Sequence, residues 1–210
     1  MKIEYVHASK FGNGATVAAE FRRLMAAHGI DVDIHDVREV SPKTLAPADL
    51  YVFSSPGRMG RPIRSMRRFL KKVDLPVGTR YALVSTEMAP RPDKKTGALP
   101  TAQERAKHQR IIPIMNQLLT RDGLVDIADT TILVEAMRGP LEPAWTDKVE
   151  ELVAKVISTT IATVDPVPHH ERMVGDPAAC ATTKMGNAAA RTNSTEVDPS
   201  SADVSVDVWC

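Results

Sequence analysis

The first 28 residues combine a short apolar strand, a loop with two glycines and an amphipathic helix. Residues 1–6 are mostly apolar, and residues 9–16 supply the small and polar side chains of a tight turn. Val17, Phe21 and Met25 then recur at helical spacing. A helix that starts directly after a strand presents backbone N–H groups without partners, and its dipole adds positive charge there. The unit therefore predicts an α/β sheet with an anion site, best suited to phosphate, at this turn.

The turn differs from the two common phosphate-binding signatures. It lacks the Gly-Lys-Ser/Thr ending of the Walker loop and the three spaced glycines of the dinucleotide loop. Gly12 and Gly14 have access to backbone angles closed to other residues, and Ser9 and Asn13 add hydrogen-bonding side chains. Two interpretations stay open: a phosphate site, or an ordinary turn in which Asn13 or Ser9 caps the helix.

Strand and helix patterns alternate along the rest of the chain. Beyond the first unit we expect strands over residues 31–37, 50–53, 80–85 and 131–134, with a short additional strand from residue 124. The first of these suits a sheet edge. We expect helices over residues 16–28, 63–72 and 101–121, and a last one from Pro143, with Pro113 kinking or dividing the third. Alternation of this kind predicts a parallel sheet with helices on both faces.

Ligands of such sheets bind beyond the carboxyl ends of the strands. We expect three loops to converge there, over residues 9–16, 54–61 and 85–90. Glu87 is the only carboxylate in this rim, and no residue is assigned a catalytic role. His7, at the end of the first strand, is expected to be a packed residue rather than a catalyst.

Composition narrows the class of protein. Aromatic residues make up only 4% of the chain, which predicts an aliphatic core. The net charge of +1 gives no reason to expect nucleic acid or membrane attraction, and no apolar run reaches the length of a membrane span. The two cysteines, Cys180 and Cys210, cannot form a disulfide framework. We expect a soluble, cytoplasmic protein.

The composition changes near residue 165. Residues 165–210 are rich in Pro, Ala, Ser and Thr and show no apolar periodicity, which predicts a disordered tail after a domain of residues 1–164. His169, His170 and Cys180 match no metal-ligand spacing, so no metal site is expected.

The order of the loops resembles the flavodoxin family over residues 1–160. The first loop, Ser9-Lys10-Phe11-Gly12-Asn13-Gly14, resembles the family's Ser-Lys-Tyr-Gly-Asn-Thr variant. The second, Ser55-Pro56-Gly57-Arg58-Met59-Gly60, resembles the Thr-Pro-Thr-Arg-Phe-Gly segment of flavodoxin-like NAD(P)H:quinone oxidoreductases. Residues 135–141 are similar to the segment before the family's last helix.

The resemblance implies a three-layer fold with strand order 2-1-3-4-5 and a bound FMN. The phosphate would lie on the amides of residues 10–14, with hydrogen bonds from Ser9 and Asn13. The isoalloxazine would lie between the second loop and the third, which contributes Ser85, Thr86 and Glu87. At Gly57, a peptide could turn its carbonyl toward flavin N5; the alternative is that this glycine only permits a turn.

The implied function is electron transfer or NAD(P)H-dependent quinone reduction. The partners would be NAD(P)H, a quinone or a redox protein, and oligomerisation is left open. Arg58 and Arg61 in the second loop could meet an anion, whereas Arg64, Arg68 and Lys72 are spaced as a solvated helix face.

Several positions depart from the family pattern. Phe11 and Gly14 stand where flavodoxins often have hydroxyls, and Thr16 either compensates or points into its helix. Met59 stands where an aromatic is expected, and residues 85–90 contain none. Met59 and Met88 could pack on the flavin through sulfur or could be core residues. These departures motivate an alternative: a flavodoxin-fold module that has lost flavin and serves interaction or regulation.

Overall fold

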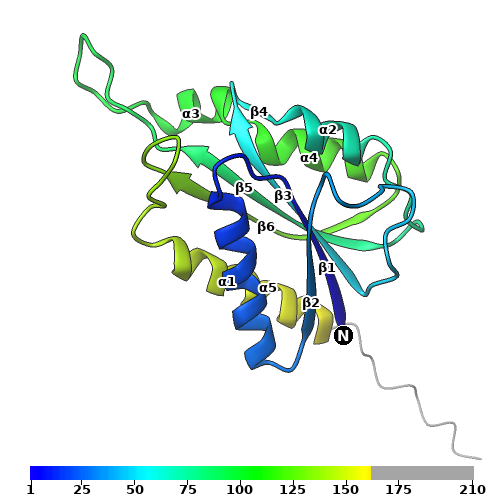
Figure 1. Ribbon diagram of the computed structural model, residues 1–210. Coiled ribbons are helices and arrows are strands. Elements are labelled where there is room, and N and C mark those ends of the chain that lie inside the picture. The colour runs from blue at the N-terminus through cyan, green and yellow to red at the C-terminus, as the bar shows by residue number, and fades with distance from the viewer. Residues whose placement is uncertain (162–210) are drawn as a thin grey trace, which may run out of the picture. The chain divides into compact units, whose positions relative to one another are not determined.

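Five parallel strands form a sheet in the order β2-β1-β3-β5-β6 in the computed structural model, which describes residues 1–161 (Figure 1). The strands are β1 (Lys2–His7), β2 (Asp31–Asp36), β3 (Leu50–Arg58), β5 (Arg80–Met88) and β6 (Val125–Val134). A two-residue strand, β4 (Arg61–Pro62), pairs antiparallel with the end of β3. Apart from β4, this is the predicted order, and β2 lies at an edge as expected.

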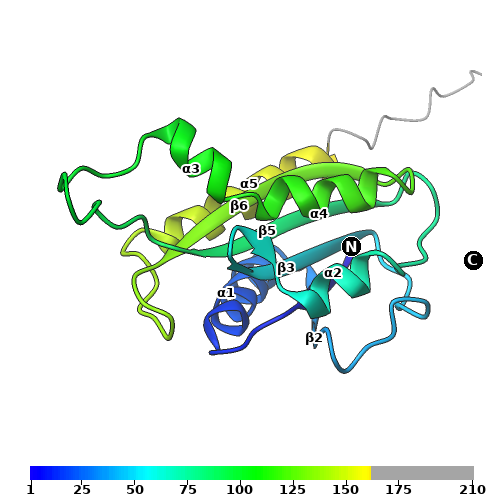
Figure 2. The ribbon, with the colours of Figure 1, turned by 90° about the horizontal axis from the view of Figure 1, so that it is seen from above.

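Helices cover both faces of the sheet (Figures 1 and 2). On one face, α1 (Asn13–Ala27) and α5 (Trp145–Ile161) pack over side chains such as Ile3 and Val52. On the other, α2 (Arg64–Leu70) and α4 (Ile111–Thr120) pack over Phe53 and Leu83. A further short helix, α3 (Ala102–His108), precedes α4. The result is the expected three-layer arrangement.

The core is less aliphatic than composition suggested. Aliphatic side chains fill most of it, but Tyr5, Tyr81, Phe21 and Phe53 are its four largest fully buried residues. The rings of Tyr5 and Phe21 lie 5.4 Å apart between β1 and α1. Few aromatics are present, and the fold places most of those described inside, where their large apolar area contributes most.

Helix α1 has well-defined ends. It begins at Asn13, before the expected residue 16, and Gly12 precedes it in the left-handed conformation. At its other end Gly29 has φ +69°, and the N–H groups of Gly29 and Ile30 donate to the carbonyls of Ala26 and Met25. This is a Schellman cap, for which a glycine is favoured.

Two strands continue further than the sequence predicted. Polar and turn-forming residues after Phe53 and Val84 indicated loops, but β3 runs to Arg58 and β5 to Met88. The extension is stable because Ser55 pairs with Ser85 and Pro56 with Thr86, so the added backbone stays within the parallel ladder. The two segments expected from residue 124 to 134 form a single strand, β6, with a bulge opposite Tyr81 and Ala82.

The helix expected over residues 101–121 is divided, as foreseen, but not at Pro113. It breaks at Gln109 and Arg110. Pro113 lies in the first turn of α4, where a missing N–H costs no intrahelical hydrogen bond. Helix α2 is shorter than expected, and the last helix begins at Trp145, two residues after Pro143.

No helix lies in the connection between β2 and β3, residues 37–49, which contains turns only. On the sheet face near this connection, the carboxylate of buried Glu4 lies 2.8 Å from His35 Nε2 and 3.1 Å from Lys2 Nζ. The two sheet edges also carry acidic side chains: Asp31 and Asp33 on β2, and Asp126 and Asp129 on β6.

The expected domain boundary after residue 164, the expected tail of residues 165–210, and His169, His170 and Cys180 lie outside the described residues. Among the helices of residues 1–161, none combines the length and apolar character needed to cross a membrane. The same residues contain no cluster of three or more His, Cys, Asp or Glu side chains suited to a metal ion.

Candidate functional site

The carboxyl ends of β1, β3 and β5 bring the three expected segments side by side. His7 of β1 pairs with Ser54 of β3, and the Ala8 N–H donates to the Ser54 carbonyl at 2.9 Å. Ser55 in turn pairs with Ser85 of β5. The predicted convergence is therefore confirmed, although the second and third segments are largely strand rather than loop.

The first segment leaves the start of α1 without a side-chain cap. Gly12 precedes the helix at φ +92°, and neither Asn13 nor Ser9 caps the first turn. Ser9 Oγ instead accepts from the Gly12 N–H at 3.1 Å. The Thr16 hydroxyl donates to the Gly12 carbonyl at 3.3 Å, so it points back along the helix. The first-turn N–H groups of α1 therefore face outward without a side-chain partner.

Gly14 packs closely against the loop that precedes α1. A Cβ atom at this position would lie 3.3 Å from the Ala8 carbonyl oxygen and 3.5 Å from Ser9 Cβ. A side chain here would therefore require the loop to move by a few tenths of an ångström.

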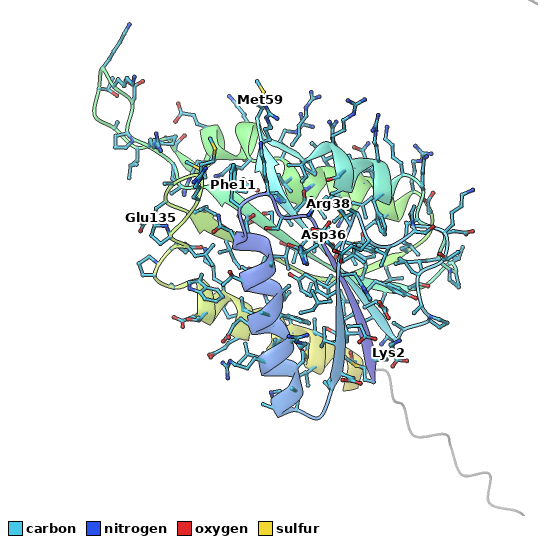
Figure 3. The ribbon with its side chains drawn as sticks, viewed as in Figure 1. Lys2, Phe11, Asp36, Arg38, Met59 and Glu135 are labelled. Atoms are coloured by element: carbon cyan, nitrogen blue, oxygen red, sulfur yellow. The ribbon has the colours of Figure 1, made fainter. Side chains whose placement is uncertain are left out.

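The segment before α5 packs against the same loop. Gly139 lies beside the side chain of Asn13, since a Cβ on Gly139 would be 3.3 Å from Asn13 Oδ1. Two cations lie over the Phe11 ring. The Arg138 guanidinium is 5.9 Å from the ring centroid, and Lys10 Nζ is 5.4 Å from it. Figure 3 shows Phe11 at this turn, close to the segment that contains Glu135. Two cations therefore flank the start of α1.

The second segment ends in a hairpin. Arg58 pairs with Arg61, which leaves Met59 and Gly60 as a two-residue turn. Both have positive φ, +52° for Met59 and +69° for Gly60, as in a type I′ turn. Met59 is 93% exposed at the tip (Figure 3), so it is not a core residue. Arg58 and Arg61 are exposed on either side of it.

Gly57 packs against the side chain of Ile111 in helix α4. It lies within β3, where it pairs with Pro62, and not at a turn. A Cβ atom on Gly57 would meet Ile111 Cδ1 at 2.6 Å. The absence of a side chain on Gly57 therefore leaves room for the Ile111 side chain in its present position.

The third segment contributes a buried polar group. Ser85 and Glu87 point toward the α4 face, and Thr86 toward the opposite face. The Ser85 hydroxyl donates to Glu87 Oε1 at 3.1 Å and lies 2.9 Å from Thr131 Oγ1. Glu87 is only 4% exposed, and burial raises the pKa of its carboxyl group.

The hydroxyl groups of Ser55 and Ser85, both in the predicted site, form hydrogen bonds within the fold. Ser55 and Ser85 are fully buried. Ser55 Oγ accepts from the Ile63 N–H at 3.2 Å and donates to the Pro56 carbonyl, which fixes the start of α2. Thr86 is also buried. All three residues are therefore buried, and their predicted part in cofactor binding stays a prediction.

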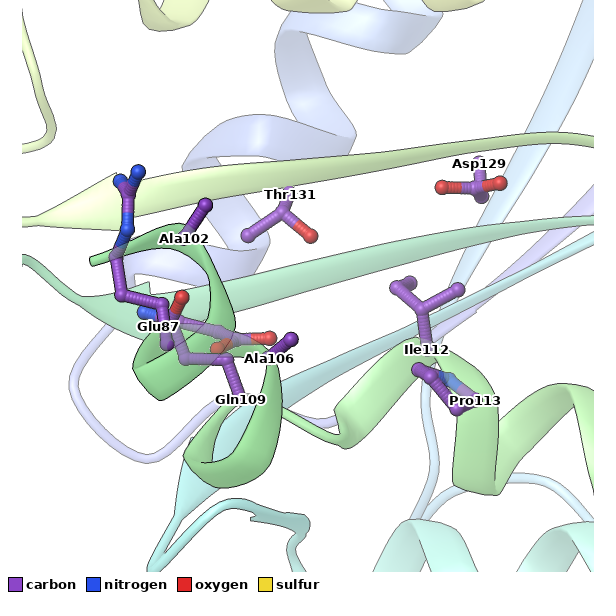
Figure 4. Close-up of a pocket in the computed structure, with 9 residues that line it drawn as sticks. Glu87, Ala102, Ala106, Gln109, Ile112, Pro113, Asp129 and Thr131 are labelled. Carbon is purple, nitrogen blue, oxygen red and sulfur yellow. The ribbon is translucent and has the colours of Figure 1, made fainter.

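Two adjoining cavities open at this end of the sheet. The smaller, ≈ 250 Å³, lies between the hairpin and the end of β5 and is lined by Gly57, Met59, Gly60, Glu87 and Met88, among others. The larger, ≈ 440 Å³, lies between α3 and β5–β6 (Figure 4). Glu87, Arg105 and Gln109 line both. Four of the residues predicted from the second and third segments thus meet in one cavity.

Sequence reasoning missed the contribution of α3 and α4. Arg105 and Gln109 line the cavities, the Gln109 side chain donates to the Met88 carbonyl at 3.4 Å, and the Arg110 N–H donates to the Gly60 carbonyl at 3.2 Å. A signal was present: the stripe Ala102, Arg105, Ala106, Gln109 interrupts the apolar periodicity of the expected helix.

His7 is packed, as expected. It is 8% exposed, and burial lowers the pKa of its imidazole against the opposing effect of neighbouring Asp36. The Asp36 carboxylate accepts two hydrogen bonds from the Arg38 guanidinium, at 2.8 and 2.9 Å (Figure 3).

No protein-family model and no curated protein sequence matches this chain. Solved protein structures do match this chain. A flavodoxin from Streptococcus pneumoniae TIGR4 superposes with a TM-score of 0.57 at 15% identity, over 76% of this chain and 99% of that one. A flavodoxin from the domain Archaea gives 0.56 at 12% identity, over 77% and 99%. Rubredoxin oxygen:oxidoreductase from Desulfovibrio gigas gives 0.56 at 10% identity, over 77% of this chain but 36% of that chain. The chain therefore has a flavodoxin-like fold.

Proposed function

We propose that this chain, given its flavodoxin-like fold, binds FMN and acts as a redox protein. One observation carries the proposal: Gly57, Met59, Gly60 and Glu87, from the two segments implied to hold the isoalloxazine, line a single cavity. Beside it, the first turn of α1 has no side-chain cap. A phosphate group and a flat ring would thus each find a suitable surface at one edge of the sheet.

The residues present fit the two ends of FMN. The outward N–H groups after Gly12, with Ser9 and Asn13, would bind the phosphate, and nearby Lys10 and Arg138 would offset its charge. Met59 and Met88, 93% and 41% exposed, would contact the ring through polarizable sulfur in place of aromatic side chains. When bound, FMN would supply one- and two-electron transfer.

The protein's own part would be to position the ring and to manage protons. The hairpin turn is tied to α4 through the Gly60 carbonyl, so the two walls of the cavity are held together. Glu87 lies between them, and burial raises the pKa of its carboxyl group above the ordinary value, which favours the protonated state. A carboxyl group in this state is suited to donate a hydrogen bond or a proton beside a redox centre.

Exposed cations near the hairpin favour an anionic partner. Arg58 and Arg61 are solvent-exposed next to Met59 and form no ion pair within residues 1–161. They would attract the phosphates of NAD(P)H or an acidic surface of a redox protein. Electron transfer between proteins and NAD(P)H-dependent quinone reduction both agree with this arrangement.

A thermal melt with and without excess FMN tests the proposal. A ligand that binds only the folded state at about 100 times its Kd adds about 2.7 kcal/mol of stability. We expect a clear rise in Tm with FMN, a smaller rise with riboflavin, and loss of the difference in Asn13→Asp, which places a carboxylate at the phosphate site. Gln117→Glu, an equivalent change at an exposed position of α4, serves as the control. No shift at high FMN would overturn the proposal.

A second candidate is a flavin-free interaction module. Phe11 and Gly14 carry no hydroxyl for a phosphate, and the Arg138 guanidinium lies over the Phe11 ring, 5.9 Å from its centroid. In that case the protein would purify without flavin absorbance, and FMN would not change its melting temperature.

A further inference from the structure

The surface formed by α2 and the hairpin of β3 and β4, which we call the basic face, carries a high density of positive charge. Between Leu50 and Val73 the chain has seven arginine and lysine residues and no aspartate or glutamate. Six of the seven are exposed: Arg58, Arg61, Arg64, Arg68, Lys71 and Lys72. None of the six forms an ion pair within residues 1–161. The net charge of +1 therefore averages over a surface that has one strongly basic side.

The fold holds these cations on one side of the protein. The inner side of α2 is buried in the core through Met66, Phe69 and Leu70, which leaves its cationic side to solvent. The Ile63 N–H donates to Ser55 Oγ at 3.2 Å, so the start of α2 is fixed to β3 next to the hairpin. Figures 1 and 3 show the hairpin beside α2 along one border, with Met59 at its tip. The neighbouring helix α4 has no charged residue, so it supplies no carboxylate to offset the cations.

Two features of the basic face are unfavourable for a surface that meets only water. Arg64 lies in the first turn of α2, which contains no acidic residue, so its charge is repelled by the positive end of the helix dipole. Met59 is an apolar side chain that is 93% exposed, and its φ of +52° is strained for a residue with a Cβ. A partner that is both anionic and able to take up an apolar side chain would favour both residues.

An anionic lipid bilayer offers both kinds of contact. Each Lys or Arg near such a surface strengthens binding about fivefold, and clusters of four to eight are typical of proteins that bind it. One apolar anchor alone binds a bilayer only marginally, and a polybasic patch supplies the second contribution. Nucleic acid fits less well, because Tyr51, Phe53 and Phe69, the aromatic residues of residues 50–73, are all buried and cannot stack on bases.

We propose that the basic face docks on an anionic lipid bilayer, with its six exposed cations on headgroup phosphates and Met59 between the headgroups. The inference goes beyond the proposed function and does not rest on it, because neither contact needs a cofactor. When Met59 packs against a flavin ring, the six cations alone would hold the lipid surface. The docking is peripheral and reversible, since it depends on charges that salt screens.

Flotation of the full chain with lipid vesicles tests the docking. The vesicles contain phosphatidylcholine alone or with about 30% phosphatidylglycerol, which makes them anionic. We expect binding only to the anionic vesicles at about 0.1 M salt, and release at about 1 M salt. A variant with Arg64→Gln, Arg68→Gln and Lys71→Gln should bind about a hundredfold more weakly, since three contributions of about fivefold are lost.

The matched control removes three cations from another exposed segment. Arg91, Lys94 and Lys95 lie in the connection between β5 and α3 and are all exposed. The variant with Arg91→Gln, Lys94→Gln and Lys95→Gln has the same net charge as the α2 variant, and we expect it to bind like the wild type. Loss of binding in this control, with the α2 variant unaffected, would overturn the proposal.

A second measurement on the wild type locates the contact without any variant. With methyl-labelled Met and a spin-labelled lipid in the anionic vesicles, we expect the NMR signal of Met59 to broaden and that of Met137, which is 67% exposed, to stay sharp. Broadening of Met137 but not of Met59, or no binding to the anionic vesicles, would overturn the proposal. Release of the protein from vesicles by polyglutamate at equal charge concentration would indicate an acidic polypeptide instead and would also overturn it. None of these results depends on FMN, so the proposed function is tested separately by its thermal melt.

Discussion

Gly57 in β3 and Ile111 in α4 pack closely because Gly57 has no side chain: a Cβ on Gly57 would lie 2.6 Å from Ile111 Cδ1. The same two residues line the cavity proposed for the flavin ring. The width of that cavity therefore depends on how closely α4 approaches the end of β3.

Gly57→Ala should destabilise the fold by about 1 kcal/mol, at the low end for overpacking, because the atom it meets is the end of a flexible side chain. Ile111→Val removes that atom. In a double-mutant cycle by urea unfolding, we expect the pair to be more stable than the sum of the single changes predicts, by about 0.5–1 kcal/mol. Strict additivity would show that the two side chains do not compete for space.

Glu87→Gln should change the pH dependence of stability. Burial raises the pKa of Glu87 above its ordinary 4.5, so the folded protein binds this proton more tightly than the unfolded chain. The wild type therefore loses stability as pH rises from about 4.5 through the folded-state pKa, whereas glutamine cannot ionise. We expect the Tm of the variant, relative to wild type, to rise between pH 4.5 and 8. Glu151→Gln, at an exposed position of α5, should show no such trend.

Met59→Asn should stabilise the hairpin and weaken FMN binding. Met59 holds φ +52°, a conformation that costs most side chains about 1–2 kcal/mol, and Asn-Gly is the preferred type I′ sequence. We expect a gain of about 1 kcal/mol in chemical denaturation. Loss of the sulfur contact should weaken FMN up to about tenfold. Met59→Leu keeps an apolar tip without relieving the turn. A gain in stability with unchanged FMN affinity would place Met59 away from the flavin.

Arg64→Glu should stabilise α2. Arg64 opens this helix, whose first turn carries no acidic residue, and it lies one turn from Arg68. A carboxylate there would face the positive end of the helix dipole and pair with Arg68, for a gain of about 0.5–1 kcal/mol at low salt. Arg64→Gln, which removes only the repulsion, should gain less. The difference between the two variants should shrink at 1 M salt, and a difference unaffected by salt would refute the electrostatic explanation.

The sequence was sufficient for most of the fold because buried parallel strands appear as short apolar runs between amphipathic helices. Tyr51, Val52 and Phe53 mark β3 in this way. The rest of that strand was missed because Ser54 and Ser55 look like loop residues, yet they are fully buried in the ladder between β1 and β5. The local composition of a segment does not show which strands its backbone will pair with.

The residues of the candidate site were likewise predicted in part and missed in part. Gly57, Met59, Gly60 and Glu87 were predicted from segments at strand ends, and they do line one cavity because topology brings these ends together. Their role in cofactor binding stays a prediction. The contact between Gly57 and Ile111 was not accessible, since α4 lies far along the chain. Arg105, Gln109 and Thr131 were missed because only the tertiary fold places α3 opposite β6.

The aspartates at the two sheet edges have a consequence for how copies of the protein behave when crowded. An edge strand offers unpaired N–H and C=O groups to any other strand, and β2 and β6 are both such edges. Asp31 at one border and Asp129 at the other are exposed, and each would bring like charges together if two copies met along the same strand, whereas Asp33 is paired with Lys2 Nζ at 3.3 Å. Exposed like charges of this kind oppose growth of the sheet from one molecule into the next.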